Sequence, residues 1–102
     1  MKFQIKALNF FKQQIENLDP KTKRILHEKI QWIRENPYRY KKIHSKLYSK
    51  IFRVRLKINS KETRLIYAVI NPDIILICLL DRKKDYKDLE KYLSKIKKEL
   101  GI

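Results

Sequence analysis

Residues 51–58 read Ile-Phe-Arg-Val-Arg-Leu-Lys-Ile, and from residue 52 onward apolar and cationic residues alternate strictly. Side chains on a β-strand point alternately to the two faces of its sheet. As a strand, this segment turns apolar side chains to one face and Arg53, Arg55 and Lys57 to the other. We therefore expect a sheet that is buried on one face and presents a row of cations, suited to a polyanion, on the other.

Two further strand patterns follow after short turns. Residues 64–70 read Arg-Leu-Ile-Tyr-Ala-Val-Ile, and residues 74–80 read Ile-Ile-Leu-Ile-Cys-Leu-Leu. The links, residues 59–62 and 71–73, are rich in turn-forming Asn, Ser, Pro and Asp. Links this short predict an antiparallel meander. The third pattern is apolar throughout, which indicates a central strand covered at least in part on both faces.

Helical periodicity precedes these strands. Residues 3–5 alternate like a short strand, and apolar residues then recur at helical spacing as far as Leu18. Asp19-Pro20 predicts the start of a second helix, because Asp is a common cap and Pro fits the first helical position. Asn36-Pro37 predicts its end. Two helices joined this tightly form an αα-hairpin.

Apolar residues return at helical spacing between residues 85 and 100, with lysines filling the other side, which predicts a terminal amphipathic helix. The resulting order predicts an α+β fold: a small antiparallel sheet packed against an N-terminal helical hairpin, with a C-terminal amphipathic helix. We interpret residues 1–102 as one domain, because this length suits a single modest core and no linker or repeat interrupts it.

The net charge of +15 is extreme for 102 residues. It is also clustered: residues 36–60 contain eight Lys or Arg and no Asp or Glu, with aromatic residues interspersed. An anionic partner would relieve the self-repulsion of such a chain. Nucleic acid, an acidic protein and an anionic membrane surface all fit this charge. The clustering argues against a Lys-rich composition without a specific partner.

Residues that form disulfide bonds or bind metal ions are scarce in this chain. Cys78 is the single cysteine, so an internal disulfide is excluded, and with only His27 and His44 we expect neither a zinc site nor another cofactor. Cys78 lies in an apolar run, as a small buried residue does. No apolar stretch approaches the roughly 20 residues of a membrane span, and the first residues lack the apolar core of a signal peptide. We therefore expect a cytoplasmic protein.

Several short motifs, taken in order, resemble the RelE/ParE toxin superfamily of type II toxin–antitoxin systems. None is specific alone, but together they cover nearly the whole chain. They are Leu18 and Asn36-Pro37 around the helical hairpin, Phe52-Arg53-Val54-Arg55, Arg64-Leu65-Ile66-Tyr67, and Asp81-Arg82 followed by Tyr86.

RelE-type members of this superfamily cleave mRNA in the ribosomal A site. The resemblance therefore implies a toxin that is a ribosome-dependent, metal-independent endoribonuclease (an mRNA interferase) and inhibits translation. It also implies an acidic antitoxin protein as partner, with assembly into a toxin–antitoxin heterotetramer. Two alternatives stay open: a ParE-like protein that inhibits DNA gyrase without being an enzyme, and an RNA- or ribosome-binding module that cleaves nothing.

The same resemblance assigns the candidate site. Metal-free RNA cleavage uses the 2′-hydroxyl as nucleophile, so the transition state gains negative charge that fixed arginines can stabilise. The family's catalytic positions match Arg53, Arg55, Arg64, Arg82 and Tyr86, with Tyr86 as a proton-transfer candidate. The lysines that we expect to contact RNA are Lys46, Lys50, Lys57 and Lys83.

Two departures from the family pattern concern proton transfer. Many relatives have His directly before the position of Arg82, where this chain has Asp81. Asp81 can hold Arg82 or Arg64, or serve as a base. For Arg64, a structural ion pair with Glu62 or Asp81 is an alternative to a role in catalysis. Some relatives supply a Glu within the basic region, and residues 36–60 contain none.

Overall fold

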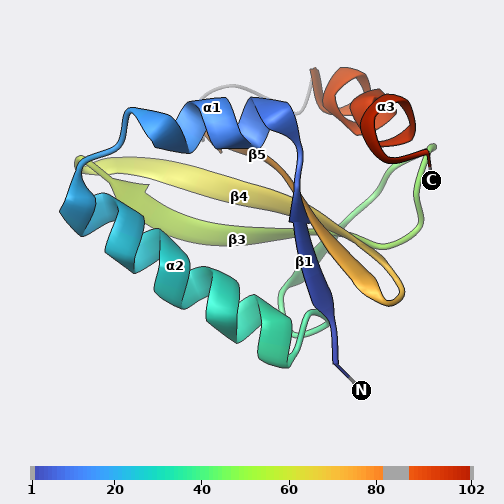
Figure 1. Cartoon of the computed structure of the whole chain (residues 1–102), viewed down its shortest axis with the longest axis horizontal. Coiled ribbons are helices and arrows are strands. Elements are labelled where there is room, and N and C mark those ends of the chain that lie inside the picture. Colours follow the sequence, from blue (N-terminus) through green and yellow to red (C-terminus); the bar gives the residue numbers. More distant parts are fainter. Residues whose placement is uncertain (1, 82–87, 102) are drawn as a thin grey trace.

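The chain folds into one five-stranded sheet with helices against both of its faces (Figure 1). The computed structural model describes residues 2–81 and 88–101. Its elements in chain order are β1 (Gln4–Ala7), α1 (Asn9–Glu16), α2 (Pro20–Glu35), β2 (Lys41–Ile43), β3 (Ile51–Ile58), β4 (Lys61–Ile70), β5 (Asp73–Asp81) and α3 (Leu89–Leu100). The predicted α+β class, helical hairpin and terminal helix are confirmed.

The sheet has the order β1-β5-β4-β3-β2, and the β3–β4–β5 meander is antiparallel as predicted. The sheet as a whole is mixed rather than antiparallel, because β1 pairs in parallel with β5, with Ile5 opposite Ile74. The chain leaves β1 through the helical hairpin and returns by the meander, so β1 and β5 come to run in the same direction. The basic connector between α2 and β3, residues 38–50, also forms an unexpected edge strand, β2, which pairs with the start of β3.

The two N-terminal helices cover one face of the sheet, which we call the helix-hairpin face. α2 begins at Pro20, directly after Asp19, as the sequence predicts. Phe11 and Ile33 are almost completely buried there. The core on this face is completed by the apolar side chains of the three meander strands, among them Phe52, Val54, Leu56, Leu65, Tyr67, Ile74 and Leu76. Burial of an aliphatic or aromatic side chain of this size is worth about 1.5–3 kcal/mol.

α3 packs on the opposite face of the sheet. Leu89, Leu93 and Ile96 are buried in one cluster with side chains of β4 and β5. Glutamates near both ends of α3 accept hydrogen bonds from distant segments. Glu90 accepts from the Ser45 hydroxyl at 3.1 Å, and Glu99 accepts from the backbone N–H of Asn9 at 2.8 Å. α3 is thereby held against both the basic connector and the start of α1.

α3 leaves one end of its face uncovered. In Figure 1 the β3–β4 turn and α3 lie at opposite ends of the sheet. Ile51, at the start of β3, is completely buried in the α3 cluster, whereas Arg55 and Lys57, farther along the strand, are exposed. We call this open end of the α3 side the basic face.

The outer edge of β5 is closed by a side chain where β1 ends. The Gln14 amide of α1 donates to the Leu79 carbonyl at 2.8 Å and accepts from the Leu79 N–H at 2.7 Å. Gln14 therefore replaces a paired strand residue. Close by, a register shift at Ile66/Tyr67 leaves both Ile77 and Cys78 buried in the α3 cluster. Burial raises the pKa of the Cys78 thiol to about 12, as expected for a structural cysteine.

No helix within the described ranges is both long enough and apolar enough to cross a membrane.

Replacing Gln14 by Ala should lower the free energy of unfolding by about 1–3 kcal/mol, because the Leu79 N–H and carbonyl lose their partners. Urea denaturation followed by circular dichroism measures this difference. Gln13→Ala is the matched control, since Gln13 is the exposed neighbour on the same helix. Equal destabilisation by the two variants would show that the Gln14 amide does not stabilise the β5 edge.

Candidate functional site

The side chains of β3 point alternately to the two faces of the sheet, as predicted. Phe52, Val54, Leu56 and Ile58 are buried, Arg53 is half-buried, and Arg55 and Lys57 are exposed. The strand thus contributes apolar side chains to the helix-hairpin face and cations to the basic face. Arg53 lies deepest, in a row of the sheet between Lys41 of β2 and Ile66 of β4.

A two-residue turn fixes which residues of β4 face these cations. Asn59 and Ser60 both have positive φ, 51° and 65°. Positive φ at both central residues is the signature of a type I′ hairpin turn, whose twist suits two antiparallel strands. The resulting register places Arg64 directly opposite Arg55 and Glu62 directly opposite Lys57.

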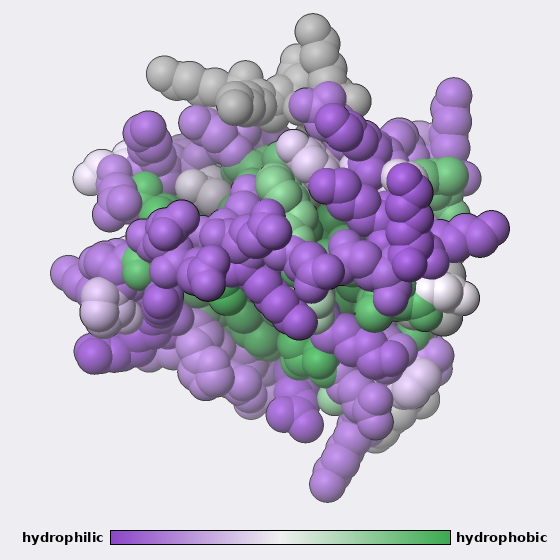
Figure 2. Space-filling view, turned by 45° about the horizontal axis from the view of Figure 1, so that its top comes forward, coloured by the Kyte–Doolittle hydropathy of each residue, from purple (hydrophilic) through white to green (hydrophobic). Residues whose placement is uncertain are grey.

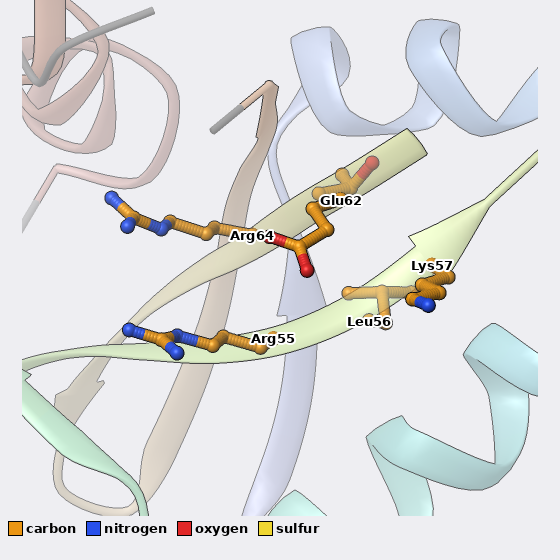
Figure 3. Close-up of a pocket in the computed structure, with 6 residues that line it drawn as sticks. Arg55, Leu56, Lys57, Glu62 and Arg64 are labelled. Atoms are coloured by element: carbon orange, nitrogen blue, oxygen red, sulfur yellow. The ribbon is translucent and has the colours of Figure 1, made fainter. Parts of the chain in front are cut away.

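The pairing of Arg55 with Arg64 brings two like charges together. Directly opposite residues of an antiparallel pair have their Cβ atoms only about 4.5–5.5 Å apart, and like charges there are destabilising. In Figure 3 both arginine side chains extend to the same side of the hairpin, lying alongside one another. An arginine can hold two phosphate oxygens through its fork of N–H groups. The pair is therefore suited to a phosphodiester placed between or above the two guanidinium groups.

A cavity of about 170 Å³ opens at this point of the hairpin (Figure 3). Its lining consists of residues from the two paired strands: Arg55, Leu56, Lys57, Glu62, Thr63 and Arg64. The cavity thus combines three cations and one carboxylate with a largely apolar lining.

Glu62 is a candidate base that the sequence interpretation considered only as an ion-pair partner of Arg64. For a glutamate base, the expectation considered only residues 36–60, where there is none, whereas Glu62 lies on the next strand. The hairpin register brings its carboxylate onto the basic face, opposite Lys57 and in the row next to Arg55 and Arg64. The two turn residues and the alternation on both sides of them were the signal that could have revealed it.

The register also fixes the face of the sheet to which Asp81 belongs. It lies at the end of β5, opposite Thr63, while Leu80 lies opposite Arg64. Because the pleat alternates, the register puts Asp81 on the side of Leu79 and Thr63 rather than on the side of Arg64. Glu62, in contrast, shares its face of the sheet with the arginine pair.

The predicted RNA-binding lysines are dispersed. Lys57 lines the cavity with the arginines. Lys46 is exposed in the connector, where its backbone N–H donates to Glu90 at 3.3 Å. Lys50 lies directly before β3 and, by the alternation, on the same side as Phe52 and Val54. Its Nζ lies 5.6 Å from the centre of the Tyr38 ring. Arg82, Lys83 and Tyr86 fall outside the described residues.

Charged and polar side chains dominate the surface that Figure 2 shows, with narrow apolar strips between them. Across residues 2–81 and 88–101, no group of three or more His, Cys, Asp or Glu residues is placed to hold a metal ion. Guanidinium groups, ammonium groups and one carboxylate are thus the chemical groups that the described part of the basic face offers.

Three solved structures match the fold closely. A double arginine-to-alanine mutant of the E. coli toxin RelE in the free state has a TM-score of 0.68 at 18% identity, over 98% of this chain and 100% of that chain. The intact E. coli RelBE toxin–antitoxin complex gives 0.65 at 16% identity, over 82% and 100%. The isolated E. coli RelE toxin gives 0.64 at 17% identity, over 94% and 99%.

No family model and no curated protein matches the sequence. At these identities the structural matches establish the fold: this chain has the fold of the RelE toxin over nearly its full length.

Replacing Arg55 by Gln should raise the free energy of unfolding in phosphate-free buffer by roughly 0.2–1 kcal/mol, the size of a cross-strand pair interaction. The same variant should gain less stability than the wild type from added inorganic pyrophosphate, because half of the arginine pair is gone. Urea denaturation with and without pyrophosphate measures both effects.

Arg24→Gln removes the same charge from an exposed position of α2 and serves as the control. If it reduces the pyrophosphate effect as much as Arg55→Gln does, the anion responds to net charge and not to the arginine pair.

Proposed function

We propose that this protein is the toxin of a type II toxin–antitoxin system and acts as a ribosome-dependent endoribonuclease that cleaves mRNA and thereby inhibits translation. One observation carries the proposal: Arg55 and Arg64 lie directly opposite each other on the open basic face of a RelE-fold sheet, beside the Glu62 carboxylate. These groups supply the charge stabilisation and a proton acceptor that metal-free phosphodiester cleavage uses.

The reaction is an in-line displacement at phosphorus. The 2′-oxygen forms a bond to the adjacent phosphorus, the bond to the 5′-oxygen of the next nucleotide breaks, and a 2′,3′-cyclic phosphate and a 5′-hydroxyl result. Arg55 and Arg64 hold the non-bridging oxygens and stabilise the added negative charge, an effect worth about 10²–10³-fold for each donor aimed at such charge. Arg53 and Lys57 extend the positive charge along the bound strand.

Two protons must move during this reaction. We assign the acceptor of the 2′-hydroxyl proton to Glu62, because the register places this carboxylate beside the arginine pair. By their match to the family motif, Tyr86 would donate the proton to the leaving 5′-oxygen, and Arg82 would be a further cation. Lys46, Lys50 and Lys83 contribute general attraction for RNA.

The net positive charge of the chain also favours binding of an acidic inhibitor protein. At +15 the toxin would attract an acidic antitoxin, which would cover the basic face until it is removed. The fold similarity to RelE within the RelBE complex supports a protein partner of this kind, and a toxin–antitoxin heterotetramer is one assembly that it would form. A substrate on ribosomes places the activity in the cytoplasm.

Arg64→Ala should reduce cleavage of ribosome-bound mRNA by about 10²–10³-fold. Purified protein is incubated with translating ribosomes, and the 5′ ends of the mRNA are mapped by primer extension. Arg24→Ala, which removes an equal charge far from the basic face, should cleave like the wild type. Intact message with the wild type, combined with inhibition of gyrase supercoiling, would replace the proposal with the ParE-like alternative.

Glu62→Gln should lower the rate of the cleavage step by about 10²–10⁴-fold, the usual contribution of a positioned general base. Binding of a non-cleavable 2′-deoxy substrate to the ribosome-bound enzyme should change little, because the substituted amide keeps the shape of the side chain. Glu16→Gln, exposed on α1, provides the matched charge change. A normal cleavage rate for Glu62→Gln would show that another group accepts the proton.

A further inference from the structure

Two exposed aromatic rings, each held beside cations, lie where α2 passes into the basic connector. Trp32 is 51% exposed and Tyr38 is 47% exposed. We call these two residues, with Lys29, Arg39 and Lys50, the aromatic–cation surface. It contains none of the residues that the proposed cleavage uses for chemistry.

Trp32 lies at the surface because α2 packs against the sheet through other side chains. α2 packs through Leu26 and Ile33, both buried. Trp32 projects from the flank of the helix, where the Nζ of Lys29 lies 5.6 Å and the Cζ of Arg39 lies 5.7 Å from its ring centre. The two cations are thus positioned at an indole that still exposes half of its surface.

Tyr38 is held in place from below. Its ring makes edge-to-face contacts with Phe3 and Phe52, at centroid distances of 6.1 and 6.0 Å. The Nζ of Lys50 lies 5.6 Å from its centre. Arg39 follows Tyr38 directly in the chain and its Cζ lies 5.7 Å from the centre of the Trp32 ring, so one chain segment contributes to the surroundings of both rings. A ring fixed in this way loses little side-chain freedom when a ligand stacks on it.

The aromatic–cation surface is separate from the basic face. Phe52, which contacts Tyr38, belongs to the core under the helical hairpin. Arg53 and Arg55 alternate with it and point to the opposite side of the sheet. A ligand on the aromatic–cation surface would therefore not occupy the position of the arginine pair.

We propose that the aromatic–cation surface binds single-stranded RNA by stacking of unpaired bases on Trp32 and Tyr38. Stacking platforms of this kind combine aromatic rings with cations that follow the backbone, and they tolerate any sequence because every base has a π-face. The three cations supply the phosphate contacts, and arginine stacks on bases as well.

RNA fits this surface better than an acidic protein segment does. A protein segment gains affinity mainly by burying apolar area in a packed centre, and the exposed aliphatic residue on this helix is Ile25, only 38% exposed. The exposed Glu28 and Glu35 on α2 limit the positive charge at the helix side. The acid-free stretch of residues 36–60 begins directly after them, so phosphates would lie toward the connector.

This inference goes beyond the proposed function, because a surface that binds RNA by stacking needs no cleavage chemistry. In a ribosome-dependent nuclease it would provide a second contact to RNA, away from the scissile bond. Its affinity would add to that of the basic face without changing the chemistry there.

The chain contains a single tryptophan, so its intrinsic fluorescence reports directly on this surface. The protein is titrated with an eight-residue oligouridylate, and tryptophan emission is recorded together with the anisotropy of a labelled oligonucleotide. Stacking on Trp32 should quench the emission with the same midpoint as the anisotropy change. Arg55→Ala/Arg64→Ala should still show this quenching.

Trp32→Ala should weaken oligouridylate binding by about 5- to 150-fold, the equivalent of about 1–3 kcal/mol for one stacked base. Trp32→Tyr, which keeps a stacking ring, should restore most of the affinity. Lys29→Ala/Arg39→Ala should reduce the slope of log K against log salt by about 0.7 for each phosphate that is no longer neutralised. Lys23→Ala/Arg24→Ala, with the same charge change at exposed positions of α2, should keep the slope of the wild type.

Binding without quenching of Trp32, or equal weakening by the two double variants, would overturn the proposal in favour of attraction by overall charge. An acidic amphipathic peptide that shifts the Trp32 emission to shorter wavelength, while oligouridylate leaves it unchanged, would overturn it in favour of protein docking. Cleavage of ribosome-bound mRNA by the Trp32→Ala variant is measured in parallel. A failure of RNA stacking on this surface is thereby distinguishable from a failure of the nuclease proposal.

Discussion

The register of the β3–β4 hairpin determines the chemistry of this protein. Because side chains alternate with a period of two, a slip of one residue would turn Arg55 and Lys57 into the core beneath α2 and expose the apolar side chains. Burial of unpaired charge is so costly that this alternative is excluded. The tight Asn59-Ser60 turn and the burial of Leu56 therefore enforce the same pairing, and the position of every described group on the basic face follows from it.

The site that this register creates conflicts with the stability of the sheet. Arg55 and Arg64 repel each other across the hairpin, and folding has to oppose that repulsion in a chain that already carries a charge of +15. The core under the helical hairpin and the packing of α3 provide the compensation. Local choices that contradict stability are typical of functional sites. The like-charge pair is therefore a feature of the proposed site that the core of the protein does not require.

Local periodicity was sufficient to predict most elements, because the period of two in residues 51–58 and the Asp19-Pro20 start of α2 depend on neighbours in the chain. Pairings between distant segments were not predictable in this way. The parallel contact of β1 with β5 joins residues about seventy positions apart, and β2 forms only because β3 offers it an edge. Glu62 was not considered as a base for a related reason: its place on the basic face depends on the hairpin register, which the composition of residues 36–60 does not reveal.

β2 lies at the edge of the sheet, between the two surfaces that we propose to bind RNA. Lys41 lies opposite Arg53 and therefore faces the side of the basic face, whereas Lys42 lies opposite Phe52 and faces the side of Tyr38. Both lysines are exposed. Lysines on an edge strand also prevent unwanted pairing with other chains, and that role alone would explain them on an isolated edge. Here the edge separates an arginine pair from an aromatic–cation surface, so an RNA strand that reaches from one to the other would pass β2 and meet a cation on each side of it.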